Sequence, residues 1–250
     1  MTHPINFSVA DGIGHLELNR PEAANTVNMA LAHGLHEAAT AAANNDDARV
    51  ILLTAAGKRF CGGGDIGAIT SANDSGAFIS ELASTADAGV QALEALDRPV
   101  VAAVHGAVAG AGLGIMLAAD VIIAAPDTKF VFAYPSVGLT PDCGVSVSLP
   151  RAMGLQRALA FALSEAPLTA EAALDQGLIT EISEDPQARA REIATSWAGK
   201  AAAALGATRQ LLRQSNTTAR TAHGERESTT IGKRVDSPEA QALINAFVSR

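Results

Sequence analysis

The chain has 250 residues, enough for one substantial core, and its composition is 48% hydrophobic but only 4% aromatic, which favours tightly packed helices over an aromatic-rich β-sandwich. The formal net charge of −8 disfavours a nucleic-acid partner, because binding to a phosphate backbone needs clustered Lys and Arg side chains. Two cysteines are too few for a disulfide scaffold, and the N-terminal residues lack the basic and apolar regions of a signal peptide, so we expect a cytoplasmic protein.

Hydrophobic patterning predicts alternating strands and helices in the first half of the chain. Asp11-Gly12 separates two apolar runs and predicts a β-hairpin of Ile5–Ala10 with Ile13–Leu18. Asn28 is the expected N-cap of the first helix. The other predicted elements here are the helices Met29–Asn44 and Ala77–Leu96 and the strands Val50–Thr54, Val100–Val104, Val121–Ala125 and Lys129–Phe132.

From Leu155 onward the pattern is mainly helical, with one short strand predicted at Ile179–Ile182. The predicted helices are Leu155–Leu163, Ala170–Gln176, Pro186–Ala198, Ala201–Gln214 and Pro238–Ser249. Alternating strands and helices followed by helices alone predict one α/β domain over residues 1–190 and a C-terminal helical region over residues 191–250.

One apolar stretch raises the question of a membrane. Val100–Ala119 contains no charged side chain and is long enough to span a bilayer. However, glycines at positions 106, 110, 112 and 114 interrupt it, and much of the remainder is alanine. A buried strand, a glycine turn and a buried helix explain this composition better, so we expect no membrane partner.

Three glycine-rich segments carry the most specific signal in the chain. They are Gly57–Ile66 (GKRFCGGGDI), Val101–Gly112 (VAAVHGAVAGAG) and Gly138–Gly144 (GLTPDCG), with Asn19–Pro21, Asp120–Ala124 and Leu149–Arg151 as further matching pieces. In order and spacing they resemble the enoyl-CoA hydratase/isomerase (crotonase) family, closest to its isomerase branch. The resemblance covers nearly the whole chain but weakens after about residue 185.

The resemblance implies an α/β fold, the crotonase (ClpP/crotonase-like) spiral of ββα units, followed by a C-terminal helical region used in trimer assembly. It implies an acyl-CoA thioester as substrate, with coenzyme A as part of that substrate and no separate cofactor. It also implies a homotrimer or a hexamer built as a dimer of trimers. No cluster of His, Cys, Asp or Glu has the spacing of metal ligands, so we expect no metal.

Two backbone N–H groups are expected to stabilise a thioester enolate. Removing a proton beside the thioester carbonyl moves negative charge onto its oxygen, and each donor already aimed at that oxygen is worth roughly 3–4 kcal/mol. Close approach of a backbone to a ligand favours Gly or Ala, and a donor at a helix start adds the positive end of the helix dipole. By resemblance, the donors are the N–H groups of Gly64 and Ala111.

The expected acid/base group is Asp142. Family members that add water to a double bond use two glutamates, but alignment places Gly114 and Tyr134 at those positions, which disfavours two-carboxylate hydration. In the isomerase branch an acidic residue after the proline of GLTPD shuttles a proton, and one carboxylate can take it from C2 and return it at C4. Burial would raise the pKa of Asp142 toward a useful value. The competing interpretation is that Asp142 belongs to a Pro-Asp-x-Gly turn.

Substrate contacts are also carried over from the resemblance. The adenine and pantetheine positions fall on Ala23, Ala24, Gly62, Asp65 and Ile66, and Asp65 is given a binding role at most. Tyr134 is expected to line the acyl pocket or to form a hydrogen bond there. Glu22 stands where many members have a lysine, so the candidate phosphate contacts are Arg59, Lys233 and Arg234.

Other reactive side chains are interpreted as structural. Cys61 and Cys143 lack an identifiable base, His105 lies in an apolar run, and Asp120 is expected to anchor local backbone.

Three functions stay open. Enoyl-CoA isomerisation leads. An enoyl-CoA hydratase or acyl-CoA thioester hydrolase, in which Asp142 alone activates water, is the second enzyme hypothesis. The third is an acyl-CoA-binding protein of this fold without catalysis.

Overall fold

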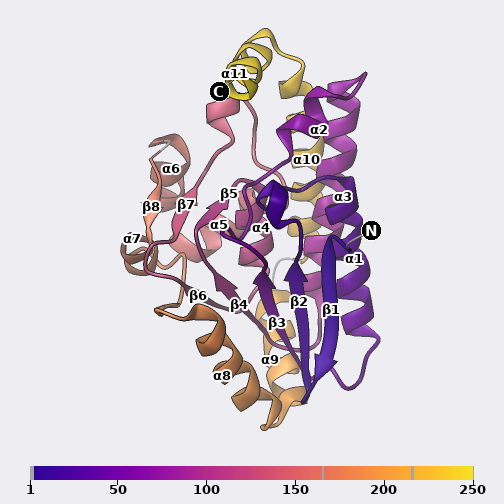
Figure 1. The fold of residues 1–250 in the computed structure, drawn as a ribbon, viewed down its shortest axis with the longest axis vertical. Coiled ribbons are helices and arrows are strands. Elements are labelled where there is room, and N and C mark those ends of the chain that lie inside the picture. The colour runs from indigo at the N-terminus through magenta and orange to yellow at the C-terminus, as the bar shows by residue number, and fades with distance from the viewer. Residues whose placement is uncertain (1–2, 165, 215–216, 250) are drawn as a thin grey trace.

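A six-stranded sheet forms the centre of the computed structural model, which describes residues 3–164, 166–214 and 217–249 (Figure 1). Its strands are β1 (Ile5–Ala10), β2 (Ile13–Leu18), β3 (Val50–Ala55), β4 (Val100–Val104), β6 (Val121–Ala124) and β9 (Glu181–Ile182), in the spatial order β1-β2-β3-β4-β6-β9. The β1–β2 hairpin is antiparallel, and every later neighbour pairs in parallel. Parallel neighbours need crossover connections, and helices supply most of them here.

A smaller sheet stands beside the first. It contains β5 (Ala107–Ala109), β7 (Lys129–Val131) and β8 (Leu168–Thr169), in the order β5-β7-β8. A strand of the large sheet is followed by one of the small sheet in the passages β4–β5 and β6–β7. The strand β3 is followed in the same way by Cys61, which forms an isolated parallel bridge to Val108 of β5. The chain therefore passes repeatedly from the large sheet to the small one and back through a helix.

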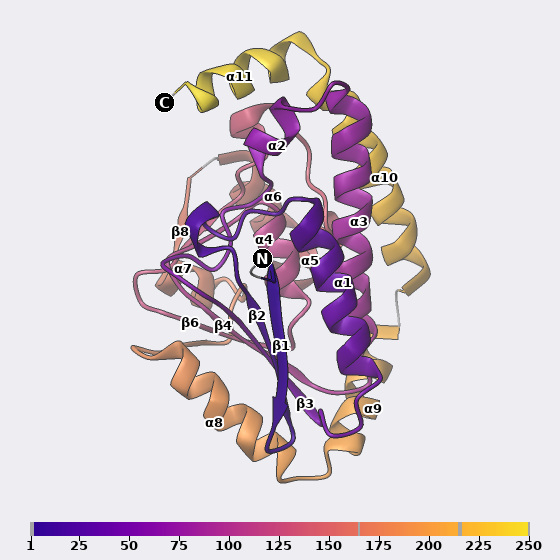
Figure 2. The same cartoon turned by 45° about the vertical axis from the view of Figure 1, so that its right-hand side comes forward.

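Helices cover both faces of the large sheet. The helices of the described residues are α1 (Met29–Ala43), α2 (Ile66–Thr70), α3 (Ser75–Ala95), α4 (Ala111–Leu117), α5 (Val145–Met153), α6 (Leu155–Ser164), α7 (Ala170–Asp175), α8 (Pro186–Ala198), α9 (Ala202–Gln214), α10 (Thr217–Val235) and α11 (Pro238–Val248), with 3-10 turns at Pro21–Ala23 and Pro135–Val137. Figures 1 and 2 show α1 and α3 on one side of the sheet, α8 on the other, and α11 beyond α2 at one end of the molecule.

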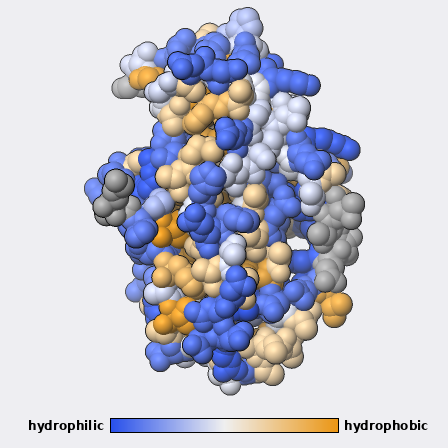
Figure 3. Space-filling view, turned by 90° about the vertical axis from the view of Figure 1, so that its right-hand side faces the viewer, coloured by the Kyte–Doolittle hydropathy of each residue, from blue (hydrophilic) through white to orange (hydrophobic). Residues whose placement is uncertain are grey.

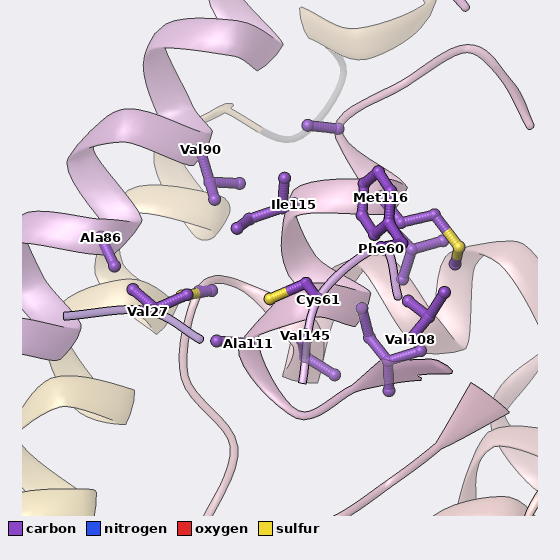
Figure 4. Packing of buried hydrophobic residues seen from close by; sticks show 14 of the residues in the cluster. Val27, Phe60, Cys61, Ala86, Val90, Val108, Ala111, Ile115, Met116 and Val145 are labelled. Atoms are coloured by element: carbon purple, nitrogen blue, oxygen red, sulfur yellow. The ribbon is translucent and has the colours of Figure 1, made fainter. Parts of the chain in front are cut away.

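Alternation along the strands divides the core into two clusters. Ile51 and Leu53 of β3 belong to the larger cluster, which includes α1, α3 and α4, whereas Val50 and Leu52 belong to the cluster under α8. Because β3 is covered on both faces, its sequence is a continuous apolar run rather than an alternating one. Figure 4 shows part of the larger cluster, where Cys61 and Val108 of the two adjoining segments are buried with Ala111 of α4.

Most predicted elements are confirmed, including the hairpin and Asn28 as N-cap, whose side chain accepts the N–H of Leu31 at 2.9 Å. The prediction missed α5 and α10 and the short elements α2, β5 and β8. The expected division at residue 190 falls inside α8, and α8 packs on the sheet through its buried alanines. Among the described residues, no helix is both long and apolar enough to cross a membrane.

Candidate active site

The two predicted donor loops lie side by side. The N–H of Ala109 donates to the carbonyl of Cys61 at 2.9 Å, within the parallel bridge that pairs Cys61 with Val108. Gly64 and Ala111 directly follow Gly63 and Gly110, which lie against each other, since a Cβ built on Gly63 would lie 3.7 Å from Cα of Gly110. Neither of these two N–H groups donates a hydrogen bond to a described residue, so two backbone donors remain available at neighbouring positions.

Glycine is required where these loops meet. Gly63 has φ +99° and Gly110 has φ +50°, a left-handed region in which side chains are strained. A Cβ on Gly63 would lie 3.2 Å from the carbonyl oxygen of Ala109, and a Cβ on Gly110 would lie 3.5 Å from Cα of Gly63. Gly110 also caps α4, so the N–H of Ala111 is the first of that helix and carries part of its positive dipole end.

A cavity of about 360 Å³ opens beside these loops. Seven of the nine predicted site residues line it, namely Ala24, Gly62, Gly64, Asp65, Ile66, Tyr134 and Asp142. Ala23 and Ala111 do not line it, although the adjacent Ala24 and Gly110 do. Much of the remaining wall is apolar and comes from α2, α3, α10, α11 and the segment before Asp142, through Ile69, Ile79, Leu82, Val137, Leu139, Ile231, Phe247 and Val248.

Asp142 is a buried carboxylate, with 9% of its surface exposed. The hydroxyl of Tyr134 donates a hydrogen bond to its Oδ1 at 2.7 Å. Burial raises the pKa of Asp142 to about 6, because a desolvated carboxylate disfavours the charged form. The Tyr134 hydrogen bond opposes this rise, and the nearby charge of Glu227 adds to it. A group with this pKa is mostly ionised near neutral pH and can still release a captured proton readily.

Tyr134 lines the cavity, and Asp142 is the partner of its hydroxyl there. Its ring meets that of Phe132 edge-on, with centroids 5.1 Å apart and planes at 64°. Burial first, and then the neighbouring charge of Asp142, raise the pKa of Tyr134 well above its ordinary value. The phenol therefore stays protonated and donates to Asp142 across the physiological pH range.

Two residues of α10 support Asp142, and the sequence analysis did not identify either. The Glu227 carboxylate accepts the N–H groups of Gly144 at 2.7 Å and Ser146 at 2.8 Å, at the start of α5. The Arg220 guanidinium forms an ion pair with Asp87 at 2.5 Å and covers Gly144, where a Cβ would collide with it. Arg220 and Glu227 are seven residues apart and lie on one buried face of α10, but charged side chains are rarely buried, so their spacing gave no signal of this role.

The first glutamate position of the hydratases cannot hold a side chain here. A Cβ on Gly114 would lie 2.5 Å from the carbonyl oxygen of Cys143 and 2.7 Å from its Cβ. Contacts under 3 Å with backbone require the chain to move. The second position is filled by Tyr134, so the cavity offers no pair of carboxylates at these two places.

Some of the charged residues predicted to bind coenzyme A already interact with other residues, whereas others are exposed. Asp65 caps α2 by accepting the N–H of Ala68 at 3.2 Å, and it pairs with Arg20 at 3.2 Å. Its carboxylate is therefore already engaged. Arg59 lines the cavity and is exposed, whereas Arg234 pairs with Glu239 at 2.7 Å. Lys233 is exposed but does not line the cavity.

The residues interpreted as structural have structural contacts. Burial raises the pKa of Cys61 to about 12 and that of Cys143 well above its ordinary value, so both remain thiols. His105 shares a hydrogen bond with the carbonyl of Gly57 at 2.9 Å. Asp120 accepts the N–H of Val100 at 2.8 Å, as expected of a residue that anchors backbone. Among the described residues, no group of three or more His, Cys, Asp or Glu is arranged to hold a metal ion.

Comparison with known proteins identifies the family of this chain. Residues 8–250 match the sequence model of the family described as Enoyl-CoA hydratase/isomerase. The chain belongs to the enoyl-CoA hydratase/isomerase family. It is similar to a protein of Rhodobacter capsulatus named "Probable enoyl-CoA hydratase", with 39% identity over 183 residues, 73% of this chain and 70% of the relative. It is also similar to the 1,2-epoxyphenylacetyl-CoA isomerase of Escherichia coli, with 37% identity over 198 residues, 75% of this chain and 74% of the relative.

Solved structures show the same family fold. The crystal structure of an enoyl-CoA hydratase from Mycobacterium avium subsp. paratuberculosis superimposes with a TM-score of 0.90 at 27% identity, covering 100% of this chain and 97% of that one. The crotonase fold expected from the resemblance, with its C-terminal helical region, is therefore confirmed. The relatives bear both hydratase and isomerase names, so the family alone does not choose between these reactions.

The raised pKa of Asp142 gives a prediction about stability. Its folded-state pKa of about 6 exceeds the ordinary 3.8, so its contribution is favourable below about pH 4 and is lost as the pH rises through 6. Asp142→Asn removes the free-energy cost of ionising a buried carboxylate. It should therefore raise the free energy of unfolding at pH 7.5 by about 3 kcal/mol. The gain should shrink toward zero near pH 4, as measured by urea unfolding at both pH values.

The control is Asp46→Asn, the same change at an exposed loop position. It should leave stability within about 0.5 kcal/mol at either pH. A loss of stability in Asp142→Asn at pH 7.5 would contradict the burial argument.

Proposed function

We propose that this family member isomerises the double bond of an enoyl-CoA, with Asp142 as the proton shuttle and the N–H groups of Gly64 and Ala111 as the oxyanion hole. The observation that carries the proposal is the position of Asp142, a buried carboxylate with a pKa of about 6 that lines the same cavity as the donor loops. Asp65, the other carboxylate on this wall, is engaged by Arg20 and by the start of α2.

The reaction needs only one proton in transit. The Asp142 carboxylate removes a proton from C2 of a 3-enoyl thioester, and the electron pair moves onto the thioester oxygen. The two backbone donors stabilise this oxygen in the resulting dienolate. Asp142, now neutral, returns the proton to C4, and the electrons return to form the C2–C3 double bond. The carboxylate is regenerated, so each turnover leaves the enzyme unchanged.

The steric closure of position 114 favours isomerisation over two-carboxylate hydration. Hydration by the family's two-glutamate route needs a carboxylate there and another at position 134, where this chain has a tyrosine. The coenzyme A portion would pass Ala23, Ala24, Gly62, Asp65 and Ile66. Of these, Ala24, Gly62 and Ile66 border the cavity without a charged side chain, which suits the neutral pantetheine arm.

The function is tested by comparing the wild type with Asp142→Asn on a 3-enoyl-CoA in deuterated water. The wild type should form the 2-enoyl product with deuterium at C2 or C4, and the variant should lose about 10²–10⁴-fold in kcat because it lacks the proton shuttle. Mass spectrometry of the thioesters separates the outcomes. A hydrated product or free coenzyme A would support the water-activating alternatives, and binding without turnover would support a non-catalytic role.

The oxyanion hole is tested at the start of α4. Ala111 is the first residue of the helix, where proline is tolerated, so Ala111→Pro deletes one N–H with little demand on the backbone. We expect kcat to fall about 10²–10³-fold. Ala111→Gly, which keeps the N–H, is the matched control and should retain most activity. If a correctly folded Ala111→Pro variant retains wild-type kcat, this N–H is not a donor to the oxyanion.

We also propose that the chain self-associates, as the family resemblance implies. Leu155, Leu159 and Leu163 recur every fourth residue on α6 and form one stripe, and all three are exposed, Leu163 by 77%. Figure 3 shows the side that carries α3 and α10, where hydrophilic residues are interspersed with apolar patches. A second copy of the chain covering the α6 stripe would remove this surface from water.

Leu159→Glu should therefore reduce the mass of the assembly in solution, because a charge would be buried in the interface. Size-exclusion chromatography with light scattering at matched concentrations measures this mass. Ala160→Glu adds the same charge at an exposed position of α6, about 100° around the helix from Leu159, and should leave the mass unchanged. If Leu159→Glu and the wild type have the same mass, α6 is not the contact.

A further inference from the structure

Tyr134 does more than line the cavity, because it forms a directed hydrogen bond with Asp142. The phenol hydroxyl donates to Oδ1 of Asp142 at 2.7 Å, and both residues are nearly fully buried. Hydrogen bonds to a carboxylate are stronger than neutral ones, and a buried pair is not weakened by competing water. Oδ1 of Asp142 is therefore held by Tyr134.

Tyr134 also lies near the donor loop. A Cβ built on Gly110 would lie 3.9 Å from Cζ of Tyr134, the ring carbon that carries the hydroxyl. Gly110 immediately precedes the N–H of Ala111, so the hydroxyl end of the ring is close to the loop that carries this N–H and is also bonded to Asp142. The ring cannot drift freely, because it packs edge-on against Phe132, which packs in turn against Phe161 with centroids 6.2 Å apart.

Other groups near Asp142 do not duplicate this role. Glu227 and Asp87 are acidic and act on Asp142 through their charge. The Cys143 thiol also interacts with Asp142, but a thiol is a weak donor. Glu227 holds the backbone after Asp142 rather than its carboxylate. Among the described residues, Tyr134 is the strong donor to this carboxylate.

We infer that Tyr134 is a positioning residue, which fixes Oδ1 of Asp142 and sets the distance between the proton shuttle and the loop that bears the Ala111 N–H. This inference rests on the proposed function and deepens it. The tyrosine keeps its own proton throughout the cycle. By stabilising the charged carboxylate, it also keeps enough of Asp142 ionised to act as a base near neutral pH.

The test is the pH dependence of kcat in Tyr134→Phe. Loss of the hydrogen bond removes the main interaction that lowers the pKa of Asp142, so the acid limb of the profile should move upward by about one pH unit. From this shift in ionisation, kcat should fall about fivefold at pH 6 and recover almost fully at pH 8, while KM changes little. Phe132→Leu, which loosens the ring but keeps the hydroxyl, is the matched control and should leave the acid limb in place.

A second measurement uses the composition of the chain. Tyr134 is its only tyrosine, so biosynthetic incorporation of 3-fluorotyrosine changes this one phenol. Fluorine makes the phenol a stronger donor without removing it, and the acid limb should move downward. If Tyr134 had a purely structural role, the acid limb would stay in place in both Tyr134 proteins. The fluorotyrosine protein also gives a result if Tyr134→Phe does not fold.

The outcomes distinguish the positioning role of Tyr134 from the proposed proton shuttle on which it rests. If Asp142→Asn retains turnover, the proposed proton shuttle fails. If Asp142→Asn is inactive but Tyr134→Phe and the fluorotyrosine protein keep the wild-type acid limb, only the positioning role fails. Opposite displacements of the limb in the two Tyr134 proteins would establish it.

Discussion

The structure depends on the close approach of two backbone segments. The loop before α2 and the loop before α4 run in parallel beside each other, joined by the hydrogen bonds around Cys61 and Val108. Glycines at 63 and 110 allow this approach, since a side chain at either position would be strained. The consequence is that two nearby backbone N–H groups, those of Gly64 and Ala111, have no hydrogen-bond acceptor among the described residues. The helix, the cavity and the carboxylate are all arranged around that pair.

A buried ionisable acid has a cost that other parts of the fold help to offset. Asp142 loses hydration, and the nearby Glu227 adds a like charge. Tyr134 supplies a compensating hydrogen bond, while Glu227 ties down the backbone that follows Asp142. Since Glu227 belongs to α10, the C-terminal helices contribute to the surroundings of Asp142 and not only to the outer surface. In the proposed mechanism, the ionised form that would accept a proton is also the form that burial disfavours.

Sequence reasoning found those parts of the site that local patterns encode. The glycine runs, the Asp11-Gly12 hairpin and the apolar strand β3 are local features, and the family resemblance placed Asp142 beside them. The missing part was α10. Its buried face carries Arg220, Glu227 and Ser228, so hydrophobic periodicity could not reveal it. The bond between Tyr134 and Asp142 could not be predicted either, because a side-chain pair depends on how the turn before Asp142 folds.

The packing of Gly114 against Cys143 bears on how activities diverge within such a family. A glutamate introduced at position 114 by a single codon change would meet the backbone of the segment that carries Asp142. Placing a carboxylate at this position would thus require the segment that carries Asp142 to move. Residue 114 and this acidic residue are therefore coupled through the backbone between them, so that a change at one position alters the other.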